Sequence, residues 1–117
     1  MLSFPTGLRI WLATRPTDLR KSFDTLAELV RQQLAADPLS GQLFVFRNKR
    51  ADRIKLLYWD DDGFVIVYKR LEKGSFRFPQ AAGAGLEIRA ADLQMLLDGV
   101  DLESVKRRPR YRRPVPV

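Results

Sequence analysis

The pattern of apolar and polar residues changes its period several times along the chain. Residues 8–13 alternate between two sets of side chains, which predicts a β-strand. Pro16 ends this strand, and Thr17 is a suitable N-cap for a helix over about residues 18–35. The apolar positions of this helix recur at steps of three and four and form one stripe: Leu19, Phe23, Leu26, Val30 and Leu34.

Four further strands are predicted after this helix, at residues 43–47, 53–59, 64–70 and 76–78, with short turn-forming segments between them. Consecutive strands joined in this way form an antiparallel meander. A short strand near residues 86–88 and a helix near residues 90–98 follow, and Gly99 is suited to end that helix. We therefore expect an α+β fold in a single domain over residues 1–104: a curved antiparallel sheet of five or six strands with one long and one short helix.

Both faces of the meander are apolar. For either plausible turn between residues 59 and 64, one face carries Leu57, Trp59, Phe64, Ile66 and Tyr68, and the other carries Leu56, Tyr58, Val65 and Val67. At the open end of the ladder, Arg53, Lys55 and Arg70 join the Trp59 face, and Lys69 joins the other. A sheet with two apolar faces must be covered on both, by helices, by its own curvature or by a second subunit.

The net charge of +7 arises almost entirely from the C-terminal residues. Residues 1–105 hold 15 Lys and Arg against 14 Asp and Glu, whereas residues 106–117 hold six Lys and Arg and no acid. Prolines interrupt this segment and it has no apolar face, so we expect a disordered basic arm over residues 105–117. Such an arm either contacts nucleic acid without reading its sequence or serves only to keep the protein soluble.

Cysteine and histidine are both absent from the sequence. The chain can form no disulfide, and it lacks the commonest general base and the usual zinc ligands. We expect a protein that is not an enzyme and that has no metal site and no cofactor. Residues 1–14 lack a signal-peptide pattern, and no apolar run is long enough to span a bilayer, so we expect a soluble, intracellular protein with no membrane partner.

Cations gather at two places in the predicted domain. Arg20 and Lys21 fall in the first turn of the expected helix, where the helix macrodipole disfavours positive charge by roughly 0.3–1 kcal/mol, so a phosphate-binding role would explain them. Arg20 could equally pair with Asp24, one turn further along the helix. The second group lies in the meander, where acids are few: Arg47, Lys49, Arg50, Arg53, Lys55, Lys69, Arg70, Lys73 and Arg77.

Other side chains in the meander have both a functional and a structural interpretation. The run of three acids at residues 60–62 could suggest a metal site, but acids before Gly63 and between two strands are typical of a hairpin turn, which we favour. The aromatic residues of the strands could stack on bases, although packing in the core is the more common role of such residues.

Four blocks of the sequence resemble one protein family. In chain order they are TDLRKSFDTLA (17–27), GQLFVFR (41–47), DRIKLLYWD (52–60) and KRLEKGSF (69–76). Together they resemble the accessory protein TnpB of bacterial insertion sequences of the IS-sixty-six type, over residues 7–101, and the chain after Asp101 lies outside the resemblance. The resemblance implies a small protein of the bacterial cytoplasm, encoded beside a DDE transposase and required with it for transposition.

The leading hypothesis is a non-catalytic DNA-binding factor of insertion-sequence transposition, with transposon ends as its partner. The alternative is an interaction module that binds the transposase or another accessory protein of the element without touching DNA. The candidate DNA-binding residues are those cations and one aromatic residue that could stack on an unpaired base: Arg20, Lys21, Arg47, Arg50, Arg53, Lys55, Trp59, Lys69, Arg70, Arg107, Arg108, Arg110, Arg112 and Arg113.

Overall fold

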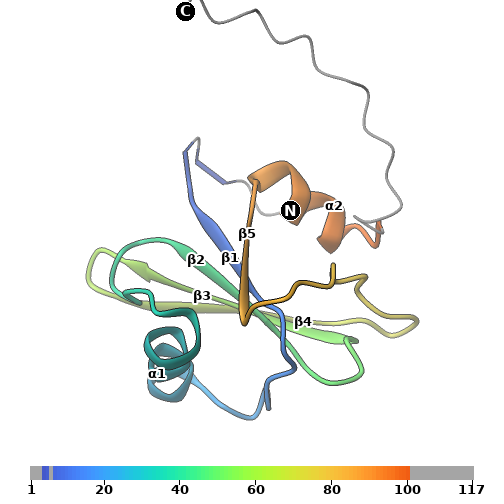
Figure 1. Cartoon of the computed structure of the whole chain (residues 1–117), viewed down its shortest axis with the longest axis horizontal. Helices are drawn as coiled ribbons and strands as arrows, with labels where there is room; N and C mark the ends of the chain where they lie inside the picture. Colours follow the sequence, from blue (N-terminus) through green and yellow to red (C-terminus); the bar gives the residue numbers. More distant parts are fainter. Residues whose placement is uncertain (1–3, 6, 101–117) are drawn as a thin grey trace, which may run out of the picture.

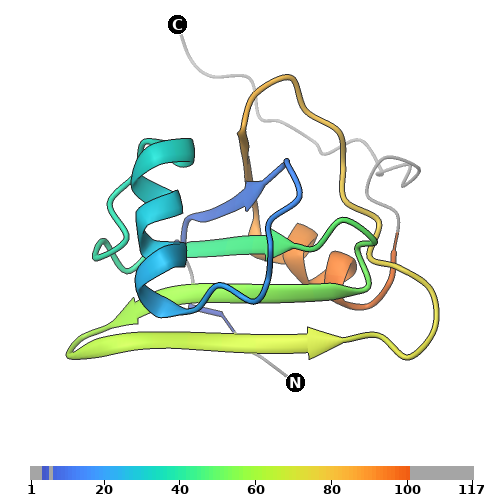
Figure 2. The same cartoon turned by 90° about the horizontal axis from the view of Figure 1, so that it is seen from below.

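Five strands form one sheet, and two helices pack against it, in a computed structural model that describes residues 4–5 and 7–100. In chain order the elements are β1 (Ile10–Ala13), α1 (Phe23–Leu34), β2 (Leu43–Arg47), β3 (Arg53–Asp60), β4 (Gly63–Arg70), β5 (Gly85–Ile88) and α2 (Ala90–Leu97). The order of strands across the sheet is β4-β3-β2-β1-β5 (Figures 1 and 2). The expected α+β domain is confirmed at this level.

The sheet is mixed, so the expectation of a purely antiparallel sheet is wrong. β1 and β2 run parallel, with Ile10 opposite Leu43, while every other neighbouring pair is antiparallel. Parallel neighbours need a crossover connection, and α1 supplies it between β1 and β2. The meander is confirmed for β2, β3 and β4 only.

Residues 76–78 do not form the expected strand. Phe76 is buried, and its N–H donates to the carbonyl of Ala51 at 2.6 Å, but the segment around it has no ladder partner. The apolar residues Phe76 and Phe78 of this segment instead cover one face of the sheet. The strand expected near residues 86–88 is present as β5. It pairs with β1 at the edge of the sheet that lies farthest from β4.

The register of the β3–β4 hairpin follows the expected parity. Trp59 lies opposite Phe64, Lys55 opposite Tyr68 and Arg53 opposite Arg70, so these residues share a face. The turn expected at residues 60–62 is also confirmed, because Asp60 pairs with Gly63 and Asp61 adopts a positive φ of 59°.

A helix covers each apolar face of the sheet (Figure 1). On one face, Leu26 and Val30 of α1 are buried against Phe44, Phe46 and Leu57. A second core lies on the opposite face, where the buried residues are Ile10, Leu12, Leu43, Val45, Ile54, Leu56, Phe76, Ile88, Leu93 and Leu96. Both apolar faces of the sheet are therefore covered by helices of the same chain.

The first helix begins at Phe23, five residues later than the sequence pattern suggested. Ser22 is the N-cap, and its N–H donates to Thr25 Oγ1 at 3.0 Å. Thr17, the expected N-cap, is buried, and its N–H donates to the carbonyl of Arg47 at 2.8 Å, which ties this residue to the end of β2. Leu19 keeps its place in the core but belongs to the segment before the helix.

The second helix agrees closely with expectation. α2 covers residues 90–97, and Gly99 follows the cap residue Asp98 with a φ of 84°. This left-handed conformation suits a glycine after a helix C-cap. Among the described residues, no helix is long and apolar enough to cross a membrane.

The packing of α1 on the sheet has a direct stability test. Leu26 is fully buried, so Leu26→Ala should lower the free energy of unfolding by about 2–5 kcal/mol through lost burial and a residual cavity. Chemical denaturation measures this change. Leu39→Ala is the matched control, because Leu39 is 48% exposed and should cost no more than about 0.5 kcal/mol. Equal losses in the two variants would contradict the assigned α1 face.

Candidate nucleic-acid interface

A groove of about 750 Å³ lies between the segment that leads into α1 and the open end of the β3–β4 ladder. We call it the basic groove. Its lining is Pro16, Thr17, Asp18, Leu19, Arg20, Asn48, Lys49, Arg50, Arg53, Lys55 and Tyr68. Five of these residues are cations and one is an acid. The groove therefore brings together cations from two segments that are distant in the sequence, residues 16–20 and 48–55, and Tyr68 from a third.

One wall of the basic groove is the turn between β2 and β3. The Asn48 side chain closes this turn: its Nδ2 donates to Asp52 Oδ1 at 2.6 Å, and its Oδ1 accepts the N–H of Arg53 at 3.0 Å. The hydrogen bond from Asn48 and the nearby Arg50 and Arg53 charges lower the pKa of Asp52, although partial desolvation opposes the shift. This closed turn fixes the backbone from which Lys49 and Arg50 project into solvent.

The floor of the groove contains a buried lysine. Lys55 is only 8% exposed, its Nζ donates to the carbonyl of Lys21 at 2.8 Å, and it lies 4.8 Å from the centre of the Tyr68 ring. A buried ammonium group is costly unless polar groups compensate it. Here the described partners are a carbonyl and an aromatic face, both neutral, so the positive charge of Lys55 adds to the field in the groove.

Two arginines face each other at the end of the ladder. Arg53 is paired directly with Arg70 across β3 and β4, and the two residues line a small hollow together with Tyr68 and Glu72. Like charges in directly opposite positions destabilise a sheet, by amounts comparable to the roughly 0.2–1 kcal/mol of a favourable pair. Arg70 relieves part of this repulsion by pairing with Glu72 at 2.9 Å, and both partners are exposed. This hollow extends the positive surface of the groove along β4.

The only acid that lines the basic groove is already engaged. Asp18 accepts hydrogen bonds from the Arg20 side chain, with Nη2 at 2.7 Å from Oδ2, and from the Arg20 backbone N–H at 3.0 Å. These bonds lower the pKa of Asp18 from 3.8 to about 2 and raise the pKa of Arg20. Among the described residues, no ion pair involves Lys49, Arg50, Arg53 or Lys55.

Comparison with known proteins assigns the family. The family model described as IS66 Orf2 like protein matches residues 8–107. The chain belongs to the IS66 Orf2-like family. Family membership indicates an accessory protein of an insertion sequence. The match includes the whole basic groove and reaches Arg107, so the expectation that the resemblance ends at Asp101 is wrong by six residues.

Two relatives from Sinorhizobium fredii support this assignment. The chain is 41% identical over 117 residues to "Uncharacterized protein y4jC", covering 100% of this chain and 99% of that protein. It is 40% identical over 101 residues to "Uncharacterized protein y4hO", covering 86% of this chain and 88% of that protein. No solved structure matches the chain.

Within this IS66 Orf2-like protein, Arg20 and Lys21 lie before the helix and not in its first turn. The Asp18 side chain holds the Arg20 backbone N–H in a local turn, so the chain enters the helix only at Ser22. These two cations therefore do not carry the macrodipole penalty expected for the first turn of a helix. The expected pairing of Arg20 with Asp24 is also wrong, because Arg20 pairs with Asp18.

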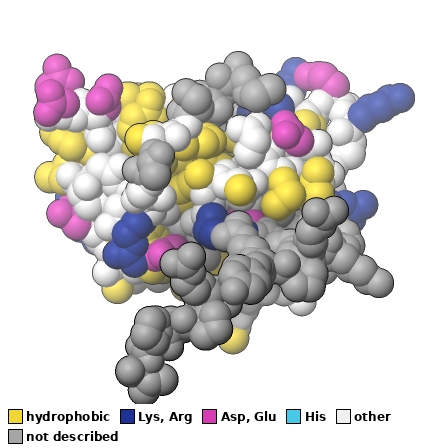
Figure 3. All heavy atoms as spheres, turned by 90° about the horizontal axis from the view of Figure 1, so that it is seen from above, with side chains coloured by type: hydrophobic (Ala, Val, Ile, Leu, Met, Phe, Trp, Pro, Cys, Tyr) yellow, Lys and Arg dark blue, Asp and Glu magenta, His cyan; other side chains and the backbone are white. Residues whose placement is uncertain are grey.

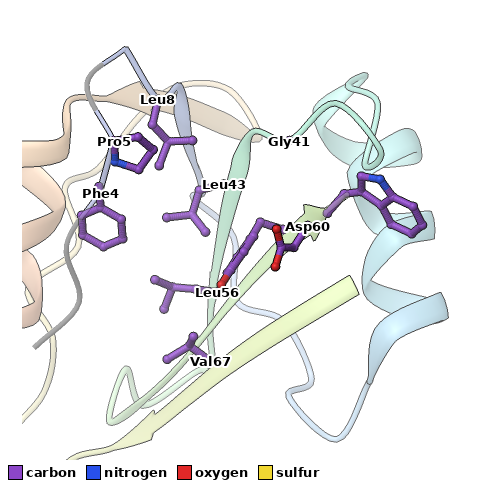
Figure 4. A pocket seen from close by; sticks show the side chains of 10 residues that line it. Phe4, Pro5, Leu8, Gly41, Leu43, Leu56, Asp60 and Val67 are labelled. Carbon is purple, nitrogen blue, oxygen red and sulfur yellow. The ribbon is translucent and has the colours of Figure 1, made fainter. Parts of the chain in front are cut away.

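Trp59 lies away from the basic groove, at the hairpin end of β3. Its ring packs edge-to-face on Phe64, with the ring centres 5.0 Å apart. Trp59 also borders a separate apolar pocket of about 270 Å³, in which Phe4 and Leu8 approach the sheet (Figure 4). The aromatic residue that lines the basic groove is Tyr68, which is 50% exposed.

Two other candidate cations also lie outside the groove. Arg47 is half-buried, donates to the carbonyl of Thr14 at 2.9 Å and lies 5.4 Å from the centre of the Phe78 ring, and burial lowers its pKa. This arginine joins the ends of β1 and β2 to the segment after β4. Lys69 is on the α2 face, where its Nζ donates to the carbonyl of Leu97 at 3.5 Å.

The structure thus separates the candidates into groups. Arg20, Arg50, Arg53 and Lys55 line the basic groove, Arg70 adjoins it, and Lys21 contributes a carbonyl to it. The arm candidates lie outside the described residues: Arg107, Arg108, Arg110, Arg112 and Arg113. Sequence reasoning overlooked Asn48, and the list of candidate residues left out Lys49 and Tyr68, which also line the groove. Strand parity could have identified Tyr68, because it shares a face with Lys55 and Arg70 at the basic end of the ladder.

The Asp18–Arg20 contact predicts a pH dependence. Because folding lowers the pKa of Asp18, its stabilising effect is fully present above about pH 4 and is lost as the pH falls towards 2. Urea unfolding of wild type and Asp18→Asn should show a stability difference at pH 4.5 that shrinks as the pH approaches 2. Asp61→Asn controls for the loss of one exposed carboxylate. A difference for Asp18→Asn that stays constant across this range would contradict the assigned contact.

Proposed function

We propose that this IS66 Orf2-like protein is a non-catalytic DNA-binding factor that acts with a DDE transposase, and that the basic groove is its DNA-binding surface. The observation that carries the proposal is the concentration of five cations against one acid in a single groove, in a domain whose 15 Lys and Arg over residues 1–105 exceed its 14 Asp and Glu by only one. A surface of this kind raises the local concentration of a polyanion and neutralises phosphates.

The cations of the groove have different roles in this proposal. Lys49, Arg50 and Arg53 are exposed and form no ion pair with any described residue, so they can contact phosphates without first breaking one. Lys55 is too buried to reach a phosphate as readily, but its charge strengthens the field below the exposed side chains. The like-charge pair of Arg53 and Arg70 costs stability in the free protein, and bound phosphate would remove that repulsion.

Tyr68 gives the groove an aromatic surface beside the cations. Its ring is half exposed and is held by the Lys55 ammonium group and by a hydrogen bond of 3.4 Å between Arg53 Nη1 and the Tyr68 hydroxyl oxygen. An aromatic ring next to a phosphate-binding surface can stack on an unpaired base. In this proposal Tyr68 takes the stacking role that the sequence suggested for Trp59.

A double substitution tests the groove. Arg50→Gln with Arg53→Gln removes two phosphate contacts, so affinity for transposon-end DNA at 100 mM salt should fall roughly 10- to 100-fold, and the slope of log K against log salt should become shallower by about 2. Fluorescence anisotropy over a salt series measures both quantities.

Arg31→Gln with Arg89→Gln is the matched control. It removes the same charge from α1 and from the residue that precedes α2, which do not line the groove. If both double variants lose affinity equally, binding depends on net charge alone and the groove is not the site.

Truncation after Val105 separates the groove from the arm. Because the groove belongs to the folded domain, the truncated protein should keep a preference for transposon-end DNA over scrambled DNA of equal length, while its total affinity falls as nonspecific phosphate contacts are lost. The same titration decides the alternative function. If neither the full chain nor the truncated chain binds DNA but the full chain binds the transposase, the protein is an interaction module.

A further inference from the structure

β4 forms a long outer edge of the sheet that the described residues leave uncovered. It covers eight residues in continuous register with β3, without a bulge or a proline, and it contains the apolar run Phe64–Val67. Among the described residues, no element lies beyond it (Figure 2). The opposite edge strand, β5, has only four residues and carries Glu87, which pairs with Arg9. An exposed strand edge is a template for pairing with another chain, and β4 offers a longer and more apolar edge than β5.

The free backbone groups of β4 follow from the hairpin geometry. The Asp60–Gly63 pair closes a two-residue turn, and such a pair is hydrogen-bonded between the strands. Alternate residues along the ladder then bond to β3, which leaves the N–H and C=O groups of Phe64, Ile66 and Tyr68 directed outward. None of these three residues makes another backbone hydrogen bond outside its own ladder within the described residues.

Charge along β4 selects the direction of a partner strand. The strand follows acids at Asp60, Asp61 and Asp62 and ends with Lys69 and Arg70. In Figure 3, acidic side chains gather at the left of the molecule, the side on which Figure 1 draws the hairpin tip, and dark blue side chains project at the right, where some acidic side chains also lie. A second copy of this strand is complementary when antiparallel, because its basic end then meets the acidic end of the first.

We propose that two copies of this protein pair through β4 in antiparallel fashion and form one continuous ten-stranded sheet. A two-fold axis at Ile66 places Phe64 opposite the partner's Tyr68 and Asp62 opposite the partner's Arg70. The outward backbone groups of the two strands then form a hydrogen-bonded ladder, and aromatic, β-branched and oppositely charged pairs face each other across it. This axis is perpendicular to the sheet, so both basic grooves lie on the same side of the dimer.

Charge variants test the pairing without altering the core. Asp62 and Arg70 are both exposed. Sedimentation equilibrium of the full chain should give a dimer of twice the 13.5 kDa chain mass. Asp62→Arg and Arg70→Asp each place like charges opposite each other at both ends of the ladder, so each should raise the dimer dissociation constant by about tenfold.

Mixing the two variants is the decisive comparison. In a heterodimer of Asp62→Arg with Arg70→Asp, both cross-strand pairs have opposite charges again, so the mixture should dimerise as tightly as wild type. A wild-type protein that stays monomeric at all accessible concentrations overturns the proposal. A dimer that is indifferent to both substitutions overturns it equally, because the interface then lies elsewhere.

Hydrogen exchange gives a second readout that does not depend on charge. The amides of Phe64, Ile66 and Tyr68 should be protected at high protein concentration and exchange freely on dilution, because only the partner strand bonds to them. The amides of Val65 and Val67, which bond to β3, should stay protected at both concentrations. Exchange at Phe64, Ile66 and Tyr68 that is independent of concentration would contradict the proposed edge.

Discussion

The segment before α1 is held against the open end of the sheet by two hydrogen bonds, and the basic groove depends on them. The Thr17 N–H donates to the carbonyl of Arg47, and Lys55 Nζ donates to the carbonyl of Lys21. The first bond ties the segment to the end of β2, and the second ties it to the third residue of β3. Together with the burial of Leu19, they bring the loop that carries Arg20 beside the strands that carry the other cations.

The crossover of α1 explains why the chain needs this anchored segment. β1 and β2 are parallel neighbours, so the chain must return along the length of the sheet between them, and α1 makes this return over one apolar face. The segment before α1 must therefore pass the open end of the β3–β4 ladder. The basic end of the ladder meets a loop whose Asp18 is already paired with Arg20. Within the described part of the chain, Lys49, Arg50 and Arg53 therefore have no acidic partner.

Much of this fold could be predicted from the pattern of the sequence. Strand alternation and turn residues identified the β3–β4 hairpin and its two faces, because a period of two leaves no choice about which side chains share a face. The start of α1 could not be predicted, because Leu19 has the spacing of a helical residue but is held in the core by a loop. The parallel β1–β2 pair was missed because strand order depends on long-range packing, which local periodicity does not record.

The candidate site was also predictable only in part, because local periodicity shows which side chains share a face of a strand but does not show contacts between distant segments. Residues on one strand pair, such as Arg53, Lys55 and Arg70, could be grouped by parity alone. Parity did not reveal that Arg47 turns towards Thr14 and Phe78, because those contacts join segments far apart in the chain. Trp59 shares a face with the cations, but it lies at the other end of an eight-residue strand.

NMR titration of the isotopically labelled full chain with transposon-end DNA shows directly whether DNA binds in the basic groove. We expect the largest shifts in backbone amide resonances at the two groove walls, in residues 17–21 and 48–55, and at Tyr68, with smaller changes on α2 and β5. Amide shifts confined to the arm, or concentrated on the α2 face of the sheet, would contradict the account.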